Sequence, residues 1–374
     1  MALTKVDQTM VSDQVFGRRN LFINGDMQVA QRGVTTTGQT STGFPTVDRW
    51  EFVASSAGTW DISQSTTVPS GEGFAYSQKL DCTTADSSLD AGNLLLWRQK
   101  IEGINLQKLK YGTSSAEKLT LSFWVRSAKT GTYIVELNNE NSGGAKKQSQ
   151  SYTISSADTW EKKTITFAGD TATAFENTTD GELLVYFWLA AGSTYTGGGS
   201  LNTSWNSGVA NNTRAKGQVN LADSTSNDWY ITGIQLEAGD NATPFEHLTF
   251  DEQSSLCKRY YQQYSGFHAM AMWTYGRNNG SCQFVLEKEM RSQPSSSYSG
   301  SLSDTGVSSG TAGVYEADWV AFSSLTLSPT SHESGNSKMI RLDTLHPANT
   351  FASNNVAVGI YFSDTFYLKF DAEL

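Results

Sequence analysis

The chain has 374 residues, of which 17% are charged, and its 27 basic and 37 acidic residues give a net charge of −10. This length allows two domains, and the negative balance excludes the positive field that attracts nucleic acid. The sequence has no run of about 18 apolar residues. Residues 1–17 lack the pattern of a signal peptide, so we expect neither membrane insertion nor the usual secretory route.

Residues 1–19 have mixed polarity and no sustained period. Such a segment is typical of an arm that becomes ordered when it docks on a partner, or of a frayed terminus. Strand patterns follow from Asn20 to about Phe245. Apolar residues alternate with polar ones in LTLSFWVRS (119–127), and the period returns in GTYIVELN (131–138). The turn SAKTG between them predicts a hairpin.

Two later segments carry stronger apolar signals. ELLVYFWLAA (182–191) is a continuous apolar run, which predicts a strand buried on both faces. In DWYITGIQLE (228–237), period-2 alternation puts Tyr230, Ile234 and Leu236 on one side. Many strands without βαβ alternation predict an all-β, antiparallel jelly roll or β-sandwich.

A segment rich in Gly, Asn, Ser and Thr lies between Ala191 and Gln218, and it is longer than ordinary connections. It contains Tyr195 and Trp205. A Trp in a polar loop offers a flat apolar surface that can stack on a sugar ring or on a neighbouring subunit. The alternative is that Trp205 folds back and fixes its own loop.

The clearest helix signal is HLTFDEQSSLCKRYYQQY (247–264). Thr249 and Glu252 fit a capping box, and Leu256, Tyr260 and Tyr264 follow four apart on one helical face. Such a helix can pack on its own domain or meet its symmetry mates in a trimer. We therefore treat these three residues as candidate oligomer contacts.

Strand-like segments resume after Ser265. Alternation in 356–362 and again in 366–370 predicts a terminal hairpin. About 110 residues suffice for an independent domain. We therefore predict an arm (1–19), a jelly roll (20–247), a linker helix (248–264) and a second, smaller β-sandwich-like domain (265–374).

Residue types that carry catalysis or bind metals are scattered. The histidines have no metal-site spacing, and no serine-hydrolase, P-loop or dinucleotide-binding motif occurs. Asp81, Asp86 and Asp90 form the densest acidic cluster, but Ser and Thr surround them. We interpret the cluster as a solvated loop rather than a glycosidase carboxylate pair. We predict no catalytic residue, no metal and no cofactor.

The cysteines are odd in number and widely spaced, at Cys82, Cys257 and Cys282. They form no C-x-x-C pair of the kind that binds zinc or exchanges disulfides. We expect free, buried thiols.

Several segments resemble the carbohydrate-binding-module-like jelly rolls of phage tail-fibre and related virion proteins. They are NLFINGDMQVAQRG (20–33), VDRWEF (47–52), LLWRQKIEG (95–103), LTLSFWVRSAKTGTYIVEL (119–137), TWEKKTITFAG (159–169) and, most specifically, the stretch 229–264. The resemblance covers roughly residues 20–264. It implies a sandwich of two antiparallel sheets, displayed as trimers whose N-terminal segment attaches to the virion.

The chain departs from that family at the Asn-Gly-Asp opening. In secreted carbohydrate-binding modules an aromatic residue and a calcium-binding Glu often follow it, whereas Met27 and Gln28 follow here. The resemblance therefore implies no metal. We expect Trp50, Trp124 and Trp229 to pack in the core. The remaining candidate glycan contacts are Tyr195, Trp205, Trp273 and Tyr275.

The resulting hypothesis is a structural virion protein of the tail-fibre or receptor-binding type, not an enzyme. Its expected partners are two further copies of itself, other virion proteins through residues 1–19, and a host cell-surface glycan, with no nucleic acid and no membrane insertion. We expect synthesis in the host cytoplasm, release by lysis and a location on the virion surface. The alternatives are a capsid decoration, head-fibre or tail-adaptor protein without a receptor role, a polysaccharide depolymerase, and a cellular carbohydrate-binding protein.

Overall fold

The computed structural model describes residues 18–207, 211–265, 268–274, 279–303, 311–315, 319–320, 324–329, 339–345, 357–363 and 365–374. Residues 1–17 of the predicted arm and the candidate contact Tyr275 lie outside this part of the chain. The chain divides into two compact units, Met1–Gln253 and Ser254–Leu374, called here the first and the second unit. The boundary falls inside the helix α2 (Phe250–Lys258).

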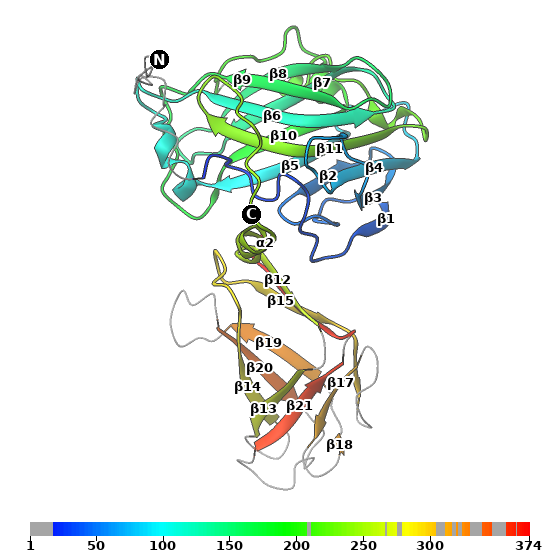
Figure 1. Ribbon diagram of the computed structural model, residues 1–374, viewed down its shortest axis with the longest axis vertical. Coiled ribbons are helices and arrows are strands. Elements are labelled where there is room, and N and C mark those ends of the chain that lie inside the picture. The colour runs from blue at the N-terminus through cyan, green and yellow to red at the C-terminus, as the bar shows by residue number, and fades with distance from the viewer. Residues whose placement is uncertain are drawn as a thin grey trace, which may run out of the picture. The chain divides into compact units, whose positions relative to one another are not determined.

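The first unit consists of two antiparallel sheets that pack face to face (Figure 1). One sheet has the order β1-β3-β4-β11-β6-β9, with the bounds Thr35–Gln39, Thr59–Ser65, Ser77–Thr84, Asp228–Ala238, Leu119–Ser127 and Glu161–Phe167. The other has the order β2-β5-β10-β7-β8, with the bounds Glu51–Ser55, Leu94–Glu102, Gly181–Ala191, Gly131–Asn139 and Lys146–Ile154. The mostly antiparallel, all-β fold class is confirmed.

Short helices occupy the connections of the first unit. They are α1 (Ser193–Thr196), η2 (Gly103–Asn105), η3 (Gln107–Leu109), η4 (Asn211–Thr213) and η5 (Leu221–Asp223).

The inward-facing side chains of the alternating strands form the core of the first unit. The alternating residues Leu119, Leu121, Phe123 and Val125 of β6 point inward and are completely buried. The ring of Phe123 meets Phe187 of β10 edge to face across the two sheets, with centroids 5.3 Å apart. Trp50 and Trp97 stack nearby at 6.3 Å. The predicted burial of β10 on both faces is confirmed, because Val185 and Phe187 face this core while Tyr186 and Trp188 belong to a second hydrophobic cluster.

The predicted hairpin of 119–127 and 131–138 is wrong. β6 pairs with β11 and β9, whereas β7 pairs with β10 and β8 in the other sheet. The short turn carries the chain from one layer to the other, and the apolar residues of both strands still reach the common core. Alternation therefore predicted the buried faces correctly but not the pairing partner.

A β-bulge interrupts β11. Its register with β6 shifts between Thr232 and Gln235, and Gly233 between them has φ +61. A bulge adds one residue to a strand and reverses the faces beyond it. Ile234 and Leu236 therefore lie in the core with Trp229 and Ile231. The prediction that Tyr230 shares their side is wrong, because Tyr230 lies before the bulge and its ring packs under the Arg126 guanidinium.

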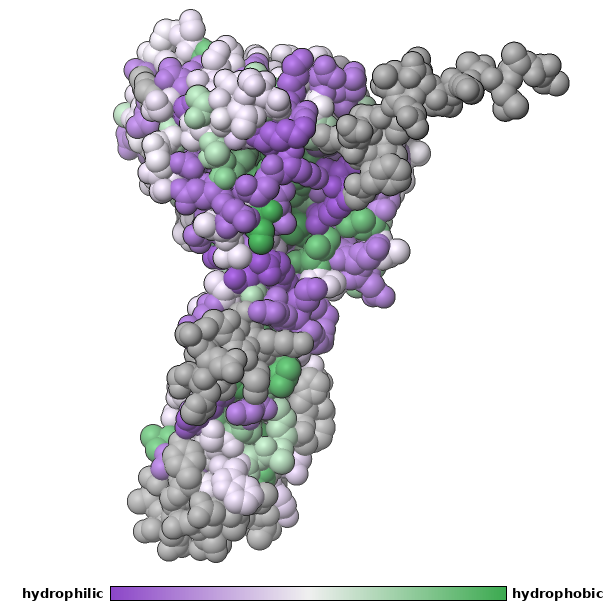
Figure 2. Space-filling model, turned by 90° about the vertical axis from the view of Figure 1, so that its left-hand side faces the viewer, coloured by the Kyte–Doolittle hydropathy of each residue, from purple (hydrophilic) through white to green (hydrophobic). Residues whose placement is uncertain are grey.

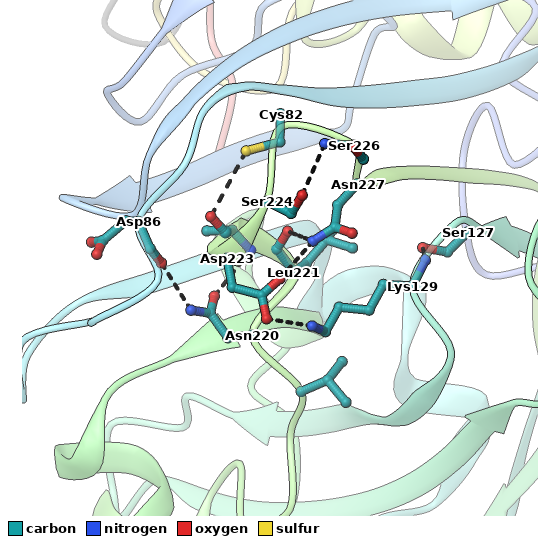
Figure 3. Close-up of polar contacts among 12 residues, drawn as sticks. Cys82, Asp86, Ser127, Lys129, Asn220, Leu221, Asp223, Ser224, Ser226 and Asn227 are labelled. Atoms are coloured by element: carbon teal, nitrogen blue, oxygen red, sulfur yellow. Dashed lines mark hydrogen bonds and ion pairs between the residues drawn. The ribbon is translucent and has the colours of Figure 1, made fainter.

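Polar contacts fix the segment that leads into β11 (Figure 3). Asn220 Nδ2 donates to the carbonyl of Asp86 at 2.9 Å, and Asn227 Nδ2 donates to the carbonyl of Leu221 at 2.8 Å. Lys129 forms an ion pair with Asp223. The Asn220 bond joins this segment to the loop after β4, and the Lys129 ion pair joins it to the turn after β6.

The second unit also has two sheets. The smaller has the order β12-β22-β15, with the bounds Tyr261–Tyr264, Tyr367–Asp371 and Ser295–Ser299. The larger has the order β16-β17-β21-β13-β14-β20-β19, with the bounds Ser301–Ser303, Thr311–Tyr315, Ala357–Phe362, His268–Thr274, Asn279–Val285, Met339–Leu345 and Ser324–Pro329, and β18 (Trp319–Val320) pairs with β17. Phe284 of β14 stacks on Phe370 of β22 at 5.8 Å, so one core joins the two sheets.

The predicted helix over 248–264 is too long. The capping box is confirmed, since Glu252 accepts from the Thr249 amide at 3.0 Å and its own amide donates to the Thr249 hydroxyl at 3.3 Å. The helix ends at Lys258, and Tyr264 lies in β12. Tyr264 packs edge to face on Phe284 at 4.7 Å and Tyr260 is buried. Leu256, Tyr260 and Tyr264 therefore do not form one helical face, because pairing with β22 replaces the last helical turns.

The predicted terminal hairpin is also wrong. β21 pairs with β13 and β17 in the larger sheet, whereas β22 pairs with β12 and β15 in the smaller. The chain turns from one layer into the other, and Phe362, Phe366 and Phe370 all enter the same core. All three cysteines are buried and none forms a disulfide, as predicted. Burial raises the pKa of the Cys82 and Cys282 thiols to about 11.

Candidate functional site

Tyr195 lies under its own loop. It sits in α1, and its ring packs on Trp188 at a centroid distance of 5.2 Å. The guanidinium of Arg214 lies over Trp188 at 5.4 Å and over Tyr195 at 6.0 Å. Tyr195 therefore helps the described residues of this loop, 192–207 and 211–218, to cover the outer face of the five-stranded sheet.

An ion pair of Arg214 holds this loop against the five-stranded sheet. Its Nε and one terminal nitrogen donate to the two carboxylate oxygens of Glu136 at 2.9 and 2.6 Å. Glu136 is completely buried. Burial raises the pKa of Glu136, and the bonds from Arg214 oppose that rise. The pair is a buried, bidentate ion pair, which stabilises a structure only while both partners are present.

Trp205 also folds back. Its Nε1 donates to the carbonyl of Ala168 at 2.5 Å, and its ring meets Tyr111 edge to face at 5.9 Å. It packs against the main core, whereas Tyr195 packs against the outer cluster. The two candidate contacts therefore do not meet. These contacts assign Trp205 a role in fixing its loop, and a glycan contact at Trp205 stays a prediction.

Trp273 of the second unit is exposed over 57% of its surface. The register places it beside Ser281, and Met272 next to it in sequence is buried in the core. It therefore projects from the outer face of the larger sheet. The exposed side chains of Tyr315, Val285 and Leu345 share that face. Trp273 remains a candidate contact.

A pocket of about 380 Å³ lies on the outer face of the six-stranded sheet of the first unit. Its lining comes from three places: the strands β6, β9 and β11, the turn before β4, and the segment after β11. The lining residues are Glu72, Phe74, Ser122, Trp124, Lys162, Gly233, Ala242, Thr243, Pro244, Phe245 and His247. Aromatic and polar side chains are combined in this pocket.

Trp124 is the largest side chain of the pocket, and the prediction that it packs in the core is wrong. It lies on β6 directly opposite Thr232 of β11 and Lys162 of β9. Its neighbours Phe123 and Val125 face the core, so the pleat turns Trp124 to the outer face, where it is only partly buried. Trp50 and Trp229, by contrast, are completely buried, as predicted.

The bulge at Gly233 shapes the pocket. A Cβ atom at Gly233 would lie 2.5 Å from Cζ of Phe74, so the absence of a side chain lets the Phe74 ring lie against the strand. Phe74 meets Phe245 edge to face at 5.2 Å, and His247 lies 5.4 and 4.9 Å from these two rings. The three rings form one aromatic wall.

A partly buried polar network fixes the segment that carries Phe245 of this wall. The Thr243 amide donates to Glu237 Oε1 at 2.8 Å, and the Glu246 amide donates to Gln235 Oε1 at 2.8 Å. The Glu246 carboxylate in turn accepts from the amides of Asn20 and Arg19 at 2.9 and 3.0 Å. Residues 243–246 are therefore fixed to β11 and to the start of the described chain, and they position Phe245.

The rest of the described surface limits the kinds of partner that the chain can bind. Among the described residues, no group of three or more His, Cys, Asp or Glu side chains could hold a metal ion. No helix in that part of the chain is long and apolar enough to cross a membrane. Figure 2 shows one face of the molecule, on which hydrophilic and near-neutral residues cover most of the first unit around a small hydrophobic group. This face has no broad apolar surface.

Comparison with known proteins finds structural similarity only. No family model matches the sequence, and no curated protein matches it. Tailspike protein 4 of bacteriophage CBA120, in its enzymatically active domain, matches with 13% identity and a TM-score of 0.31 over 59% of this chain and 21% of that chain. The chain thus spans about a fifth of the tailspike chain.

Carbohydrate-binding modules match over nearly their whole length. The family 11 module of the Clostridium thermocellum cellulase Lic26A-Cel5E has 11% identity and a TM-score of 0.27, over 55% of this chain and 96% of the module. TmCBM61, solved in complex with β-1,4-galactotriose, has 11% identity and a TM-score of 0.29, over 59% of this chain and 99% of the module.

The sequence carried two signals for the pocket. A Gly inside a strand pattern marks a bulge or a close approach of another group, and Gly233 does both. The alternation in 119–127 also placed Trp124 opposite to Phe123. The contribution of 242–247 had no such signal, because it depends on hydrogen bonds to Gln235 and Glu237 that only the folded chain forms.

Proposed function

We propose that this chain is a glycan-binding structural protein of a bacteriophage particle, of the tail-fibre or receptor-binding type. The pocket around Trp124 carries the binding part of the proposal. Sugar rings present apolar C–H faces and polar hydroxyl edges, so they suit a flat aromatic surface bordered by polar groups. Trp124 supplies the surface, and Lys162, Glu72 and Ser122 supply polar groups around it.

The particle role rests on the resemblance of residues 20–264 to virion fibre proteins. On this proposal residues 1–17 attach the chain to other virion proteins. Arg19 contacts Glu246 of the first unit, so a deletion of 1–17 keeps that contact and tests attachment alone. The deleted protein should fold normally and be missing from particles, and normal incorporation would contradict the attachment role.

Glycan binding is tested with the purified full chain on an array of bacterial surface glycans. Trp124→Ala should weaken binding by about 1–3 kcal/mol, the range for a contact that dominates an interface. Trp160→Ala is the matched control, because Trp160 is a partly buried Trp that packs on Tyr230 and does not line the pocket. Absence of binding by the unmodified protein would refute the proposal.

Binding without turnover is the second part of the proposal. Incubation of the protein with the bound glycan should release no new reducing ends, and their appearance would favour a depolymerase. Immunogold labelling of particles should mark the tail appendages, whereas labelling of the capsid would favour a head fibre or decoration protein. Light scattering should give the mass of a trimer, the state that strengthens weak contacts by avidity.

A further inference from the structure

The size of the Trp124 pocket restricts its ligand. Pockets for small molecules span about 300–1,000 Å³, and this one, at about 380 Å³, is near the lower limit. Such a volume accommodates roughly one or two sugar rings. A longer stretch of polysaccharide would have to extend beyond the lining residues.

The aromatic wall of the pocket is fixed at two points. Phe74 lies against Gly233 so closely that even a Cβ atom would meet its ring. The segment that carries Phe245 is hydrogen-bonded through Thr243 and Glu246 to Glu237 and Gln235, both of which are buried. Lengthening the pocket would break these contacts. The fixed wall therefore favours the end of a glycan over an internal segment of a linear chain.

The charges of the lining are balanced. Lys162 brings one positive charge and Glu72 one negative charge, and both side chains are exposed at the pocket. An acidic sugar would be attracted by Lys162 but repelled by Glu72, and a cationic amino sugar would be attracted by Glu72 but repelled by Lys162, so the two side chains together favour neither charge. The ammonium group donates hydrogen bonds and the carboxylate accepts them. A neutral sugar, whose hydroxyls do both, satisfies the two side chains together.

We infer that the pocket binds the terminal one or two rings of a neutral glycan, with one ring against Trp124 and its hydroxyls bonded to Lys162 and Glu72. This inference rests on the proposed glycan binding of the chain and adds the class of ligand and the length that is recognised. Two consequences follow. Affinity should stop rising beyond two rings, and it should depend little on salt, because no net charge is neutralised on binding.

The experiment uses the neutral array ligand with the strongest signal, prepared as a series of one to four rings and titrated against the full chain by calorimetry. Affinity should level off at two rings. Between about 50 mM and about 500 mM NaCl the dissociation constant should change less than about twofold. Trp124→Ala should lose about tenfold or more, while Trp160→Ala should match the unmodified protein.

Two further variants separate the charges. Lys162→Gln and Glu72→Gln should each weaken the neutral ligand by a few-fold and to a similar extent, since each removes one charged hydrogen-bonding partner. Glu72→Gln should also improve binding of an acidic analogue of the same sugar. A variant pair in which only Lys162→Gln has an effect would overturn the balanced-charge argument.

Failure of the inference differs from failure of the proposed function. If affinity keeps rising to four rings, or if only acidic glycans bind and salt abolishes their binding, the inference is wrong while glycan binding stands. If glycans bind equally to Trp124→Ala and to the unmodified protein, the pocket is not the site. If no glycan binds at all, the proposed function itself fails.

Discussion

The two units treat their outer sheet faces in opposite ways. In the first unit five tryptophans are completely buried, and one of them, Trp188, lies on an outer face that the described residues of 192–207 and 211–218 cover. In the described part of the second unit, Trp273 and Tyr315 remain exposed on the outer face of the larger sheet. The same period-2 pattern thus gives a covered face in one unit and an open face in the other.

This difference shows what a long loop contributes. Alternation decides which side chains leave the core, but it does not decide whether they meet solvent. In the first unit the ion pair between Arg214 and Glu136 holds the loop, with its own Tyr195, over Tyr186 and Trp188. The pocket at Trp124 leaves a large aromatic side chain of the six-stranded sheet accessible in a concave setting.

The largest effect should come from the ion pair that holds the cover. Arg214→Ala leaves the Glu136 carboxylate buried without its partner, so we expect a loss of about 3–5 kcal/mol in the free energy of unfolding. Urea denaturation followed by Trp fluorescence measures it, because eight of the ten tryptophans lie in the first unit. The double variant Arg214→Ala, Glu136→Gln should recover part of the loss, and no recovery would contradict the argument.

Gly233→Ala should give the second-largest loss of stability. The added methyl group would press on Phe74, and a residue with a side chain is strained at φ +61, at a cost of about 1–3 kcal/mol. The same displacement distorts the aromatic wall, so glycan binding should fall as well. Gly217→Ala is the control, since Gly217 has φ +91 and open space around it. If Gly233→Ala binds glycan as strongly as the unmodified protein, the bulge does not shape the binding site.

Trp205→Ala tests the loop from its other end. The change removes a hydrogen bond to Ala168 and the packing on Tyr111, so the free energy of unfolding should fall by about 1–3 kcal/mol. Trp205→Phe keeps an aromatic ring and should lose less. If Trp205→Ala instead keeps full stability and loses cell binding, Trp205 is a ligand contact and does not fix its loop.

Asp26 should give the first unit a pH-dependent stability. The carboxyl is buried, Oδ1 has no hydrogen-bond partner, and burial raises the pKa of Asp26 above its ordinary value of 3.8. The folded state therefore binds the Asp26 proton more tightly than the unfolded state does. Ionisation of Asp26 thus lowers the free energy of unfolding as pH rises from 3.8 through the raised pKa of the folded state.

Asp26→Asn isolates the contribution of this ionisation to stability, because the Asn side chain has the same shape and cannot ionise. Its stability relative to the unmodified protein should increase with pH over that range. Urea denaturation at several pH values measures the difference. Parallel stability profiles of the two proteins would show that Asp26 does not contribute.

Trp273→Ala should have the smallest effect on stability, within about 0.5 kcal/mol, because most of the ring is already in solvent. Adsorption to host cells is the informative measurement for this variant. A loss of adsorption at unchanged stability would make the open face of the second unit a contact surface. Adsorption equal to that of the unmodified protein would remove Trp273 from the candidate contacts.

Much of the fold could be predicted from the sequence, because burial imposes a period on a strand. The inward residues of β6 and the double burial of β10 follow directly from their patterns. The pairing of β6 and of β21 could not be predicted, since a short turn serves equally well for a hairpin and for a crossing between layers. Strand pairing depends on contacts distant in sequence, which alternation does not report.

The candidate site was harder to predict for two physical reasons. The extra residue at Gly233 reverses the faces of β11, so a strict period placed Tyr230 on the wrong side. The helical spacing of Leu256, Tyr260 and Tyr264 was outweighed by strand pairing with β22. The expectation that Trp124 packs in the core also conflicted with the alternation of its own strand, in which Phe123 and Val125 face inward.

The last strand, β22, returns to the beginning of the second unit. It pairs with β12, the Ala372 amide donates to the carbonyl of Tyr260 at 2.8 Å, and Arg291 Nε donates to the Ala372 carbonyl at 2.6 Å. The two ends of this unit are therefore neighbours on one sheet, an arrangement that tolerates grafting. The unit is suited to exchange as a cassette, by recombination or in the laboratory, with the junction placed near residue 258 and no internal strand cut.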